Sequence, residues 1–254
     1  MVVKPSLGTG GTQQVKLLWQ VEDGDVAKVK SFYDEHKDND FVVSRRKLNV
    51  EGKPPKFSHA SFWKAMVGCL LTTQQRSGPT SAASGFSGTY PFPLNYTECG
   101  RQKRLESFVR GTLTNFGGIR RSGKIAEEVQ HNFRWLENGG WREVKEQVEN
   151  LRCSPRTQKL EISTADFIDD NLKGFGPKQA RNLLQGLGLT KYEIPIDSRI
   201  TKWLNDFGFP VGLSAVALAD RSYYGFVSQG FRTLCDACGI YPCLLDAAIF
   251  SSYD

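Results

Sequence analysis

Apolar residues recur along most of the chain with the three- and four-residue spacing that one face of an α-helix requires. The clearest stripe has the spacing i, i+3, i+4, i+7 and i+8 and consists of Phe62, Ala65, Met66, Cys69 and Leu70. This stripe predicts a helix with one buried face, and Ser58 or Ser61 can cap its first turn. A polar run at residues 72–76 ends the pattern.

The same spacing predicts helices in other parts of the chain. One opens at residues 23–25 and carries on one face Val26, Val29, Phe32 and Tyr33. Others are predicted at residues 102–115, 122–137 and 141–151, and a further helix is capped near Ser163 or Thr164. Two or three helices follow Asp197, and the last carries the sequence CLLDAAIF. Strand signals are few, so the predicted fold class is mostly α.

Four segments interrupt the helical pattern. Residues 41–50, FVVSRRKLNV, predict a short extended stretch. Residues 51–56, EGKPPK, read as a linker, and residues 77–96 read as a loop, because Gly and Pro are frequent in both. Residues 1–14 predict a flexible N-terminal arm.

Composition and charge exclude few classes of protein. The chain has 254 residues, of which 39% are hydrophobic and 24% charged, as in ordinary globular proteins. Its 33 Lys and Arg exceed its 27 Asp and Glu, which favours a polyanionic partner without requiring one. No run of about eighteen apolar residues predicts a membrane span, and the first residues lack the apolar core of a signal peptide. We therefore expect a protein that is not secreted, cytoplasmic in a prokaryote or nuclear in a eukaryote.

Three of the six cysteines are clustered in the sequence CDACGIYPC, as Cys235, Cys238 and Cys243. A zinc or iron–sulfur site needs four ligands, and no fourth cysteine or histidine follows nearby. Free thiols buried as small apolar side chains are therefore predicted, and no metal site is expected.

The sequence LKGFGPKQA, around Gly174 and Gly176, has the glycine pattern of a tight turn. A dinucleotide-binding loop would need a preceding strand and a third glycine, but a helix is predicted before it and Gln179 stands at the third position. Helix, turn and helix remain, with Pro177 at the first helical position. Such a turn can present backbone N–H groups to a phosphate, or it can simply connect two helices.

Two residues near this turn are candidates for catalysis. Lys178 lies in the first turn of the second helix, where the helix dipole disfavours a cation, and a lysine attacks only as the neutral amine. Asp197 precedes an amphipathic helix and fits its N-cap, a position in which backbone N–H groups favour the carboxylate form. Each also has a purely structural interpretation, as a solvated surface lysine and as a helix cap.

LKGFGPKQA followed by PIDSR resembles the helix-hairpin-helix and Gly/Pro-Asp signature of the DNA glycosylase superfamily that includes endonuclease III. The lysine makes it most similar to the 8-oxoguanine DNA glycosylase branch, and the separation of Lys178 and Asp197, 197 − 178 = 19 residues, fits that branch. The resemblance extends over residues 57–254. It implies two helical lobes with a central cleft: residues 15–56 with 199–254, and residues 57–198 with the hairpin at 172–188.

The resemblance also implies roles for individual residues. Lys178 and Asp197 would be catalytic. DNA contacts would come from Gln74, Gln75, Arg120, Gly174, Gly176 and Arg199, with Gln74 the closest match to the residue that fills the gap left by the extruded base. The lesion pocket would contain Asp246, Phe250 and Asn182.

Three departures from the family pattern bear on these assignments. Asp246 stands where better-known members read guanine with a glutamine, so Asp246 and Phe250 remain open to interpretation as a surface residue and a core residue. The cysteine loop of endonuclease III is incomplete, and the β-rich N-terminal domain of eukaryotic members has no counterpart.

The implied activity is that of a base-flipping DNA glycosylase and AP lyase acting on 8-oxoguanine in double-stranded DNA. It requires no cofactor, although a structural monovalent cation on the hairpin carbonyls is compatible with it, and we expect a monomer without a membrane partner. Two alternatives stay open: the same fold acting on another oxidised base, and a helix-hairpin-helix protein that binds DNA without chemistry.

Overall fold

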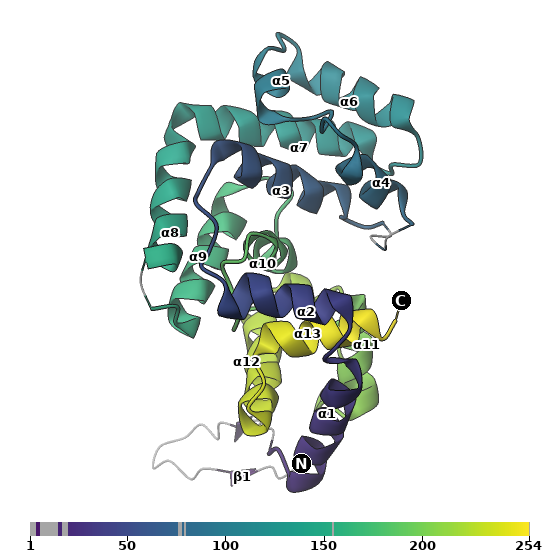
Figure 1. Ribbon diagram of the computed structural model, residues 1–254, viewed down its shortest axis with the longest axis vertical. Coiled ribbons are helices and arrows are strands. Elements are labelled where there is room, and N and C mark those ends of the chain that lie inside the picture. Colours follow the sequence, from purple (N-terminus) through teal and green to yellow (C-terminus); the bar gives the residue numbers. More distant parts are fainter. Residues whose placement is uncertain are drawn as a thin grey trace. The chain divides into compact units, whose positions relative to one another are not determined.

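The computed structural model describes residues 4–5, 15–16, 20–75, 78, 80–153 and 155–253. Nearly all regular structure in these residues is helical, which confirms the predicted mostly α class (Figure 1). The exception within the described residues is the short antiparallel pair of β1 (Lys4–Pro5) and β2 (Val15–Lys16). The remainder of the N-terminal arm predicted at residues 1–14 lies outside the described residues.

The chain forms two compact units, and each is described here by itself. Unit 1 comprises Met1–Val43 and Ile196–Tyr253, and unit 2 comprises Ser44–Pro195. The two units meet in the sequence after residues 43 and 195. The lobes that the sequence implies would instead meet after residues 56 and 198. Residues 44–56 belong to unit 2 because Asn49 is fully buried there and its side-chain amide donates to the carbonyl oxygens of Gln185, at 3.0 Å, and Thr190, at 2.8 Å.

Unit 1 is built from packed helices: α1 (Asp23–His36), the first residues of α2 (Asp40–Arg45), α11 (Ser198–Phe207), the 3₁₀ turn η3 (Ala217–Ala219), α12 (Arg221–Cys238) and α13 (Pro242–Ser251). α1 and α11 both pack against α13, and α12 packs against α1 and α13. No single described helix is long and apolar enough to cross a membrane; only α12 and α13, bent by 98°, reach that criterion as a pair, and both are core helices of unit 1.

Unit 2 contains the remaining helices: α3 (His59–Leu71), α4 (Ala82–Gly88), α5 (Tyr96–Gly100), α6 (Leu105–Phe116), α7 (Ser122–Trp135), α8 (Trp141–Cys153), α9 (Gln158–Asn171), α10 (Pro177–Gly186), and the π-helical turns η1 (Arg46–Glu51) and η2 (Leu136–Gly140). α3 packs against α4, α5, α7 and α10, and so lies at the centre of the unit.

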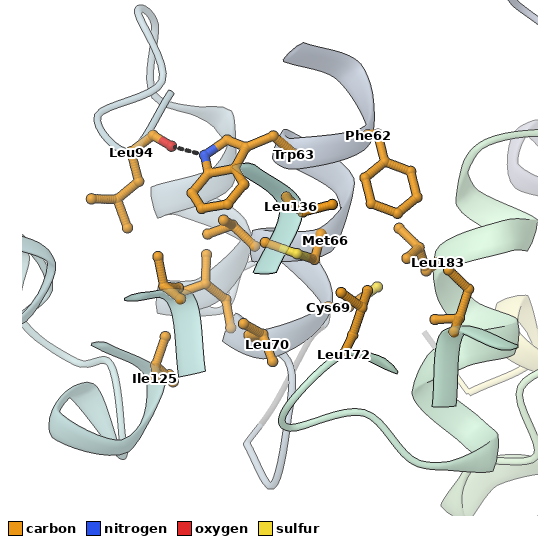
Figure 2. Close-up of a cluster of buried hydrophobic side chains, with 14 of the residues drawn as sticks. Phe62, Trp63, Met66, Cys69, Leu70, Leu94, Ile125, Leu136, Leu172 and Leu183 are labelled. Carbon is orange, nitrogen blue, oxygen red and sulfur yellow. Dashed lines mark hydrogen bonds between the residues drawn. The ribbon is translucent and has the colours of Figure 1, made fainter. Parts of the chain in front are cut away.

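The buried face of α3 forms the core of unit 2, as its apolar stripe predicts. Phe62, Trp63 and Met66 are at most 1% exposed, and Figure 2 shows them among apolar side chains from α7 and α10. The indole N–H of Trp63 donates to the carbonyl oxygen of Leu94 at 2.8 Å, which satisfies the one polar atom of a buried ring. Ser58 caps the helix by accepting the Ser61 N–H.

Two of the predicted interruptions are wrong. Residues 41–50 are helical, in α2 and η1, because tertiary contacts override the preference of a β-branched run: Val42 is fully buried with Ala247 and Ala248. The loop predicted at residues 77–96 contains α4, which is held by the buried side chains of Ala83 and Phe86.

The start of α9 also differs from the prediction. Thr157 caps this helix by accepting the Leu160 N–H, so Ser163 and Thr164 lie inside it rather than at its first residue. Thr164 is fully buried.

The prediction of buried free thiols is confirmed for the cluster Cys235, Cys238 and Cys243, and all six cysteines are free. Burial raises the pKa of the Cys235 thiol well above its ordinary value. Among the described residues, no group of three or more Cys, His, Asp or Glu side chains is placed to hold a metal ion.

A buried carboxylate in α9 fixes the segment that follows α10. Glu161 is fully buried and accepts N–H bonds from Lys191 at 2.9 Å, and from Tyr192 and Glu193 at 2.8 Å each. Burial raises the pKa of Glu161 to about 7, although these three N–H groups act in the opposite direction. Glu193 itself is paired with the buried guanidinium of Arg181 at 2.6 Å.

Glu161→Gln is expected to flatten the pH dependence of stability. Between pH 4.5 and about 7, folded Glu161 keeps a proton that the unfolded chain has released, so stability falls as the pH rises through this window. The shift corresponds to roughly 3 kcal/mol. Urea unfolding at about pH 4.5 and about pH 8 measures it. Between these two pH values, wild type and the exposed control Glu146→Gln should lose more unfolding free energy than Glu161→Gln. Equal losses in all three proteins would contradict the raised pKa of Glu161.

Candidate active site

The sequence LKGFGPKQA forms a helix-hairpin-helix in unit 2. α9 ends at Asn171 with Leu172 as its C-cap, the chain turns with the Phe175 N–H bonded to the Leu172 carbonyl at 3.2 Å, and α10 begins at Pro177. Gly176 is the N-cap of α10 and offers no side chain to the first turn. Because the first N–H groups of a helix have no intrahelical partner, this end of α10 can bind an anion.

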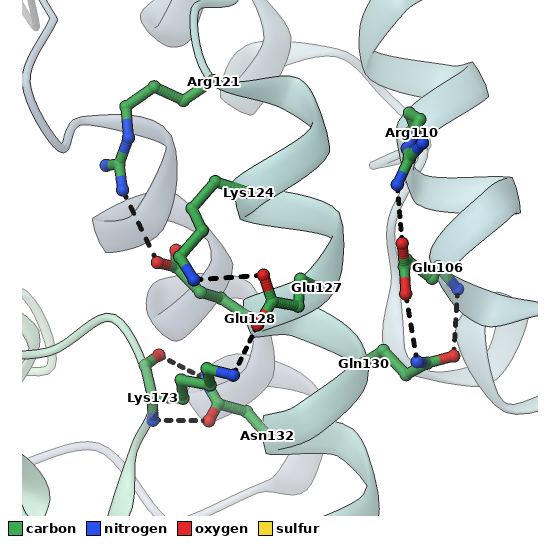
Figure 3. A network of polar contacts seen from close by, with 9 residues as sticks. All are labelled: Glu106, Arg110, Arg121, Lys124, Glu127, Glu128, Gln130, Asn132 and Lys173. Atoms are coloured by element: carbon green, nitrogen blue, oxygen red, sulfur yellow. Dashed lines mark hydrogen bonds and ion pairs between the residues drawn. The ribbon is translucent and has the colours of Figure 1, made fainter.

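Side chains of helix α7 bond to the hairpin at Lys173. Asn132 grips the backbone of Lys173 twice, accepting its N–H at 2.8 Å and donating to its carbonyl at 3.0 Å (Figure 3). The Lys173 ammonium pairs with Glu127, and Lys173 together with Lys124 lowers the pKa of that carboxyl to about 2. Glu128 is 3% exposed, and burial raises its pKa.

The two hairpin glycines differ in what a side chain at each position would meet. Gly174 has φ +86°, and a Cβ there would stand 2.6 Å from the Glu128 carboxyl carbon and 2.8 Å from a Leu70 methyl group. A Cβ on Gly176 meets nothing within 4 Å, and its φ of −145° suits any residue. Folding therefore requires glycine at 174 but not at 176.

Gly174→Ala is expected to destabilise the protein by about 2 kcal/mol or more, since it combines a left-handed backbone with a clash. Gly176→Ala is the matched control: it should leave the unfolding free energy within about 1 kcal/mol of wild type, because the added methyl group meets nothing within 4 Å. Thermal unfolding measures both variants. Equal stability of both variants would contradict this account.

Lys178 lies in the first turn of α10 and is partly buried. Cys69 of α3 is its neighbour, and burial raises the pKa of the Cys69 thiol to about 12, with the Lys178 charge acting in the opposite direction. Cys69 is therefore a neutral group beside the amine. Asn182, one turn after Lys178, donates to the Cys69 sulfur at 3.5 Å and lines a hollow of about 370 Å³ together with residues of α3 and α4.

The end of α3 presents the first of two neighbouring glutamines. Gln74 is exposed and has φ +56°, which is uncommon for a residue with a side chain. Gln75 is partly buried, donates to the Leu71 carbonyl and accepts the Arg120 N–H at 2.9 Å. Both ends of the Gln75 amide are thus bonded within unit 2.

Asp197 is in unit 1, where it is the N-cap of α11, as its position in the sequence predicts. Its Oδ1 accepts the N–H groups of Arg199 at 2.8 Å and Ile200 at 3.0 Å. Just before it, the Ile196 N–H donates to the hydroxyl oxygen of the buried Tyr224 at 2.7 Å. These bonds hold the carboxylate in a fixed position.

Phe250 of α13 is covered by two side chains of unit 1. The Arg199 guanidinium carbon is 4.1 Å from its ring centroid, and Phe41 is stacked on it with centroids 4.8 Å apart and an interplanar angle of 28°. Arg199 also reaches Asp197 Oδ2 at 3.5 Å. Arg199 therefore joins the candidate catalytic carboxylate to the candidate stacking ring.

Asp246 lies one turn before Phe250 on α13 and is only 6% exposed. The interpretation of Asp246 as a surface residue is therefore wrong. A buried carboxylate is costly unless its surroundings compensate it, so its position suits a residue with a specific partner.

The predicted residues fall into two groups. Within unit 2 the structure brings together the hairpin, Lys178 and Asn182 on one side and the end of α3 with Arg120 on the other. Within unit 1 it brings Asp197, Arg199 and Phe250 together, with Asp246 on the same helix as Phe250. Two further residues were not expected: Gln179, which contacts the end of α3, and Phe41. Of these two, only Gln179 could have been found from the sequence, because it is a polar residue on the apolar face of α10.

Three solved structures are similar to this chain. The 8-oxoguanine DNA glycosylase of Methanocaldococcus jannaschii matches 91% of this chain and 95% of its own, with a TM-score of 0.62 and 18% identity. The 8-oxoguanine glycosylase/lyase of that organism in complex with a 15mer DNA containing 8-oxoguanine matches 89% and 96%, with a TM-score of 0.63 and 17% identity. The 8-oxoguanine DNA glycosylase of Thermotoga maritima matches 89% and 94%, with a TM-score of 0.58 and 19% identity.

No family model and no curated protein matches the sequence. The structural matches cover about nine-tenths of both partners, and they include the helix-hairpin-helix superfamily branch that the hairpin sequence resembles. The chain therefore has the fold of the 8-oxoguanine DNA glycosylases.

Proposed function

We propose that this protein is a base-excision-repair DNA glycosylase with AP lyase activity that removes oxidised guanine. The observation that carries the proposal is the partly buried Lys178 in the first turn of α10, at the uncapped helix end of a hairpin suited to a phosphate. A protein that only binds DNA requires neither a lysine at this place nor the carboxylate of Asp197 nineteen residues later, and the fold is shared with 8-oxoguanine DNA glycosylases.

In the proposed reaction, the neutral Lys178 amine attacks C1′ of the extruded nucleotide. The bond from C1′ to the base nitrogen breaks, and the base leaves with the electron pair and takes up a proton. Opening of the sugar ring gives an imine between Lys178 and C1′. Loss of a proton from C2′ then breaks the bond between C3′ and its oxygen, which nicks the strand.

Asp197 has two proposed tasks. Its carboxylate stabilises positive charge that develops on the sugar, and it favours transfer of a proton away from the attacking amine. The two backbone N–H bonds to Oδ1 hold this carboxylate in one place, which is the arrangement that electrostatic stabilisation needs.

The remaining candidates would bind the DNA. The hairpin at Gly174 and Gly176 would grip a phosphate without reading sequence, and Gln74 would fill the gap in the duplex. Arg120 and Arg199 would contact the backbone. Because M. jannaschii 8-oxoguanine glycosylase/lyase has been solved with DNA containing 8-oxoguanine, we propose double-stranded DNA with a damaged base as the partner of this chain.

The lesion pocket would be formed by Asp246, Phe250 and Asn182. A carboxylate can accept from both N1–H and the 2-amino group of a guanine ring, and Phe250 can stack on the base once Arg199 or Phe41 leaves its ring. No cofactor takes part in the proposed chemistry, and a monovalent cation on the hairpin carbonyls would be structural.

A substrate panel tests the choice of lesion. Duplexes with 8-oxoguanine opposite each of the four bases are compared with duplexes that carry an oxidised pyrimidine, and base release and nicking are scored separately. Faster release of 8-oxoguanine supports the proposal, while faster release of the pyrimidine would replace it with the alternative that Asp246 motivates. Lesion-blind, salt-dependent binding without release would leave only a DNA-binding protein.

A further inference from the structure

Two glutamine side chains hold the end of α3, where the exposed Gln74 begins the loop. Gln179, the residue after Lys178, is 7% exposed, and its amide nitrogen donates to the Cys69 carbonyl at 2.9 Å and to the Thr73 hydroxyl at 2.8 Å. The helix of the candidate nucleophile is thereby tied to the residue directly before Gln74.

Gln75 forms the second tie, from the other side of Gln74. Its amide nitrogen donates to the Leu71 carbonyl, and its oxygen accepts the Arg120 N–H at 2.9 Å. This bond links the end of α3 to the segment that enters α7. One amide thus satisfies a helix-end carbonyl and a loop N–H together, which no apolar side chain of the same size can do.

Gln74 itself stands between these two ties with φ +56°. A residue with a side chain keeps a left-handed backbone only where the surrounding structure imposes it. Among the described residues, the bond to Thr73 on one side and the bonds of Gln75 on the other hold the two neighbours of Gln74.

We infer that Gln179 and Gln75 form a clamp that positions Gln74 relative to Lys178 and Arg120. Gln75 then acts through its neighbours rather than by touching DNA. The inference rests on the proposed function, because Gln74 matters only if it fills the gap left by an extruded base. The clamp lies wholly within unit 2, so the geometry that it sets is internal to one compact unit.

The test compares paired with unpaired lesions. The variants are Gln179→Leu and Gln75→Leu, which keep the size of the side chain but remove its hydrogen bonds, with Gln179→Met as a second form. Gln130→Leu, which loses two longer bonds at 3.4 Å to Glu106 on a different surface, is the matched control. The substrates are a duplex with 8-oxoguanine opposite cytosine, the same strand opposite an abasic-site analogue, and a single-stranded abasic oligonucleotide.

Single-turnover base release from the paired duplex should fall about tenfold in each clamp variant, since gap filling then competes less well with re-stacking. Release from the unpaired lesion should change less than about threefold. In Gln75→Leu, nicking of the single-stranded abasic site should not change, because Gln75 bonds Leu71 and Arg120 and not the residues around Lys178. Hydrogen exchange at the Arg120 amide should accelerate in Gln75→Leu and not in Gln130→Leu.

Equal losses on paired and unpaired lesions would show that the glutamines act on the chemistry or on the fold at large, and would overturn the clamp. So would unchanged release from the paired duplex. If wild type releases no base from any substrate, the proposed function fails, and an Arg120 amide that exchanges equally in wild type and Gln75→Leu overturns the clamp independently.

Discussion

Lys178→Gln is expected to abolish base release, with a fall of at least about 10³-fold in the single-turnover rate. Glutamine has a similar length but no nucleophilic amine, so neither attack at C1′ nor the imine can follow. The fold should tolerate the change because Lys178 is only partly buried and Cys69 beside it is neutral. Gel quantification of heat-labile abasic sites measures release separately from nicking.

Lys173→Gln is the matched control, since this lysine lies in the same hairpin but pairs with Glu127. It should weaken DNA binding modestly and keep the rate of base release at saturating enzyme. Loss of release in Lys173→Gln with retention in Lys178→Gln would move the nucleophile to the other lysine and contradict the account.

Asp197→Asn is expected to lower base release by about 10²- to 10³-fold while leaving the fold nearly unchanged. Asparagine is as good an N-cap as aspartate, so the bonds to the Arg199 and Ile200 N–H groups survive. What the variant loses is the negative charge proposed to stabilise the sugar. Single-turnover kinetics and chemical denaturation, run on one preparation, separate the two effects.

Asp197→Ala completes this comparison. It removes the cap as well as the charge and should cost about 1 kcal/mol more stability than Asp197→Asn, with a similar loss of base release. If Asp197→Asn keeps the wild-type rate and only Asp197→Ala loses it, Asp197 is a structural cap and no more.

The sequence predicts the helices of this protein well where local and global preferences agree. The stripe of α3 and the N-caps Ser58 and Asp197 follow from spacing and side-chain chemistry over a few residues. The prediction fails at residues 41–50, where burial of Val42 against Ala247 and Ala248 outweighs the β-branched composition. A contact between positions some two hundred residues apart leaves no trace in a local pattern.

In the candidate site, too, features set by the local sequence can be predicted and features set by long-range contacts cannot. The hairpin around Lys178 and the N-cap at Asp197 can be predicted because each depends on a few residues that are contiguous in sequence. The difference between Gln74 and Gln75 cannot, because it depends on the Arg120 N–H, which α7 brings to the end of α3. The cover of Phe250 by Phe41 and Arg199 likewise depends on packing inside unit 1. Each of these is a long-range contact made through a side chain.

Borohydride trapping with peptide mapping tests the central claim most directly. Wild-type protein is incubated with a duplex carrying 8-oxoguanine, the imine is reduced to a stable amine, and the cross-linked peptide is identified by mass spectrometry. The account predicts a covalent adduct on Lys178, formed by wild type and Lys173→Gln but not by Lys178→Gln. No adduct despite base release, or an adduct mapped to another residue, would contradict it.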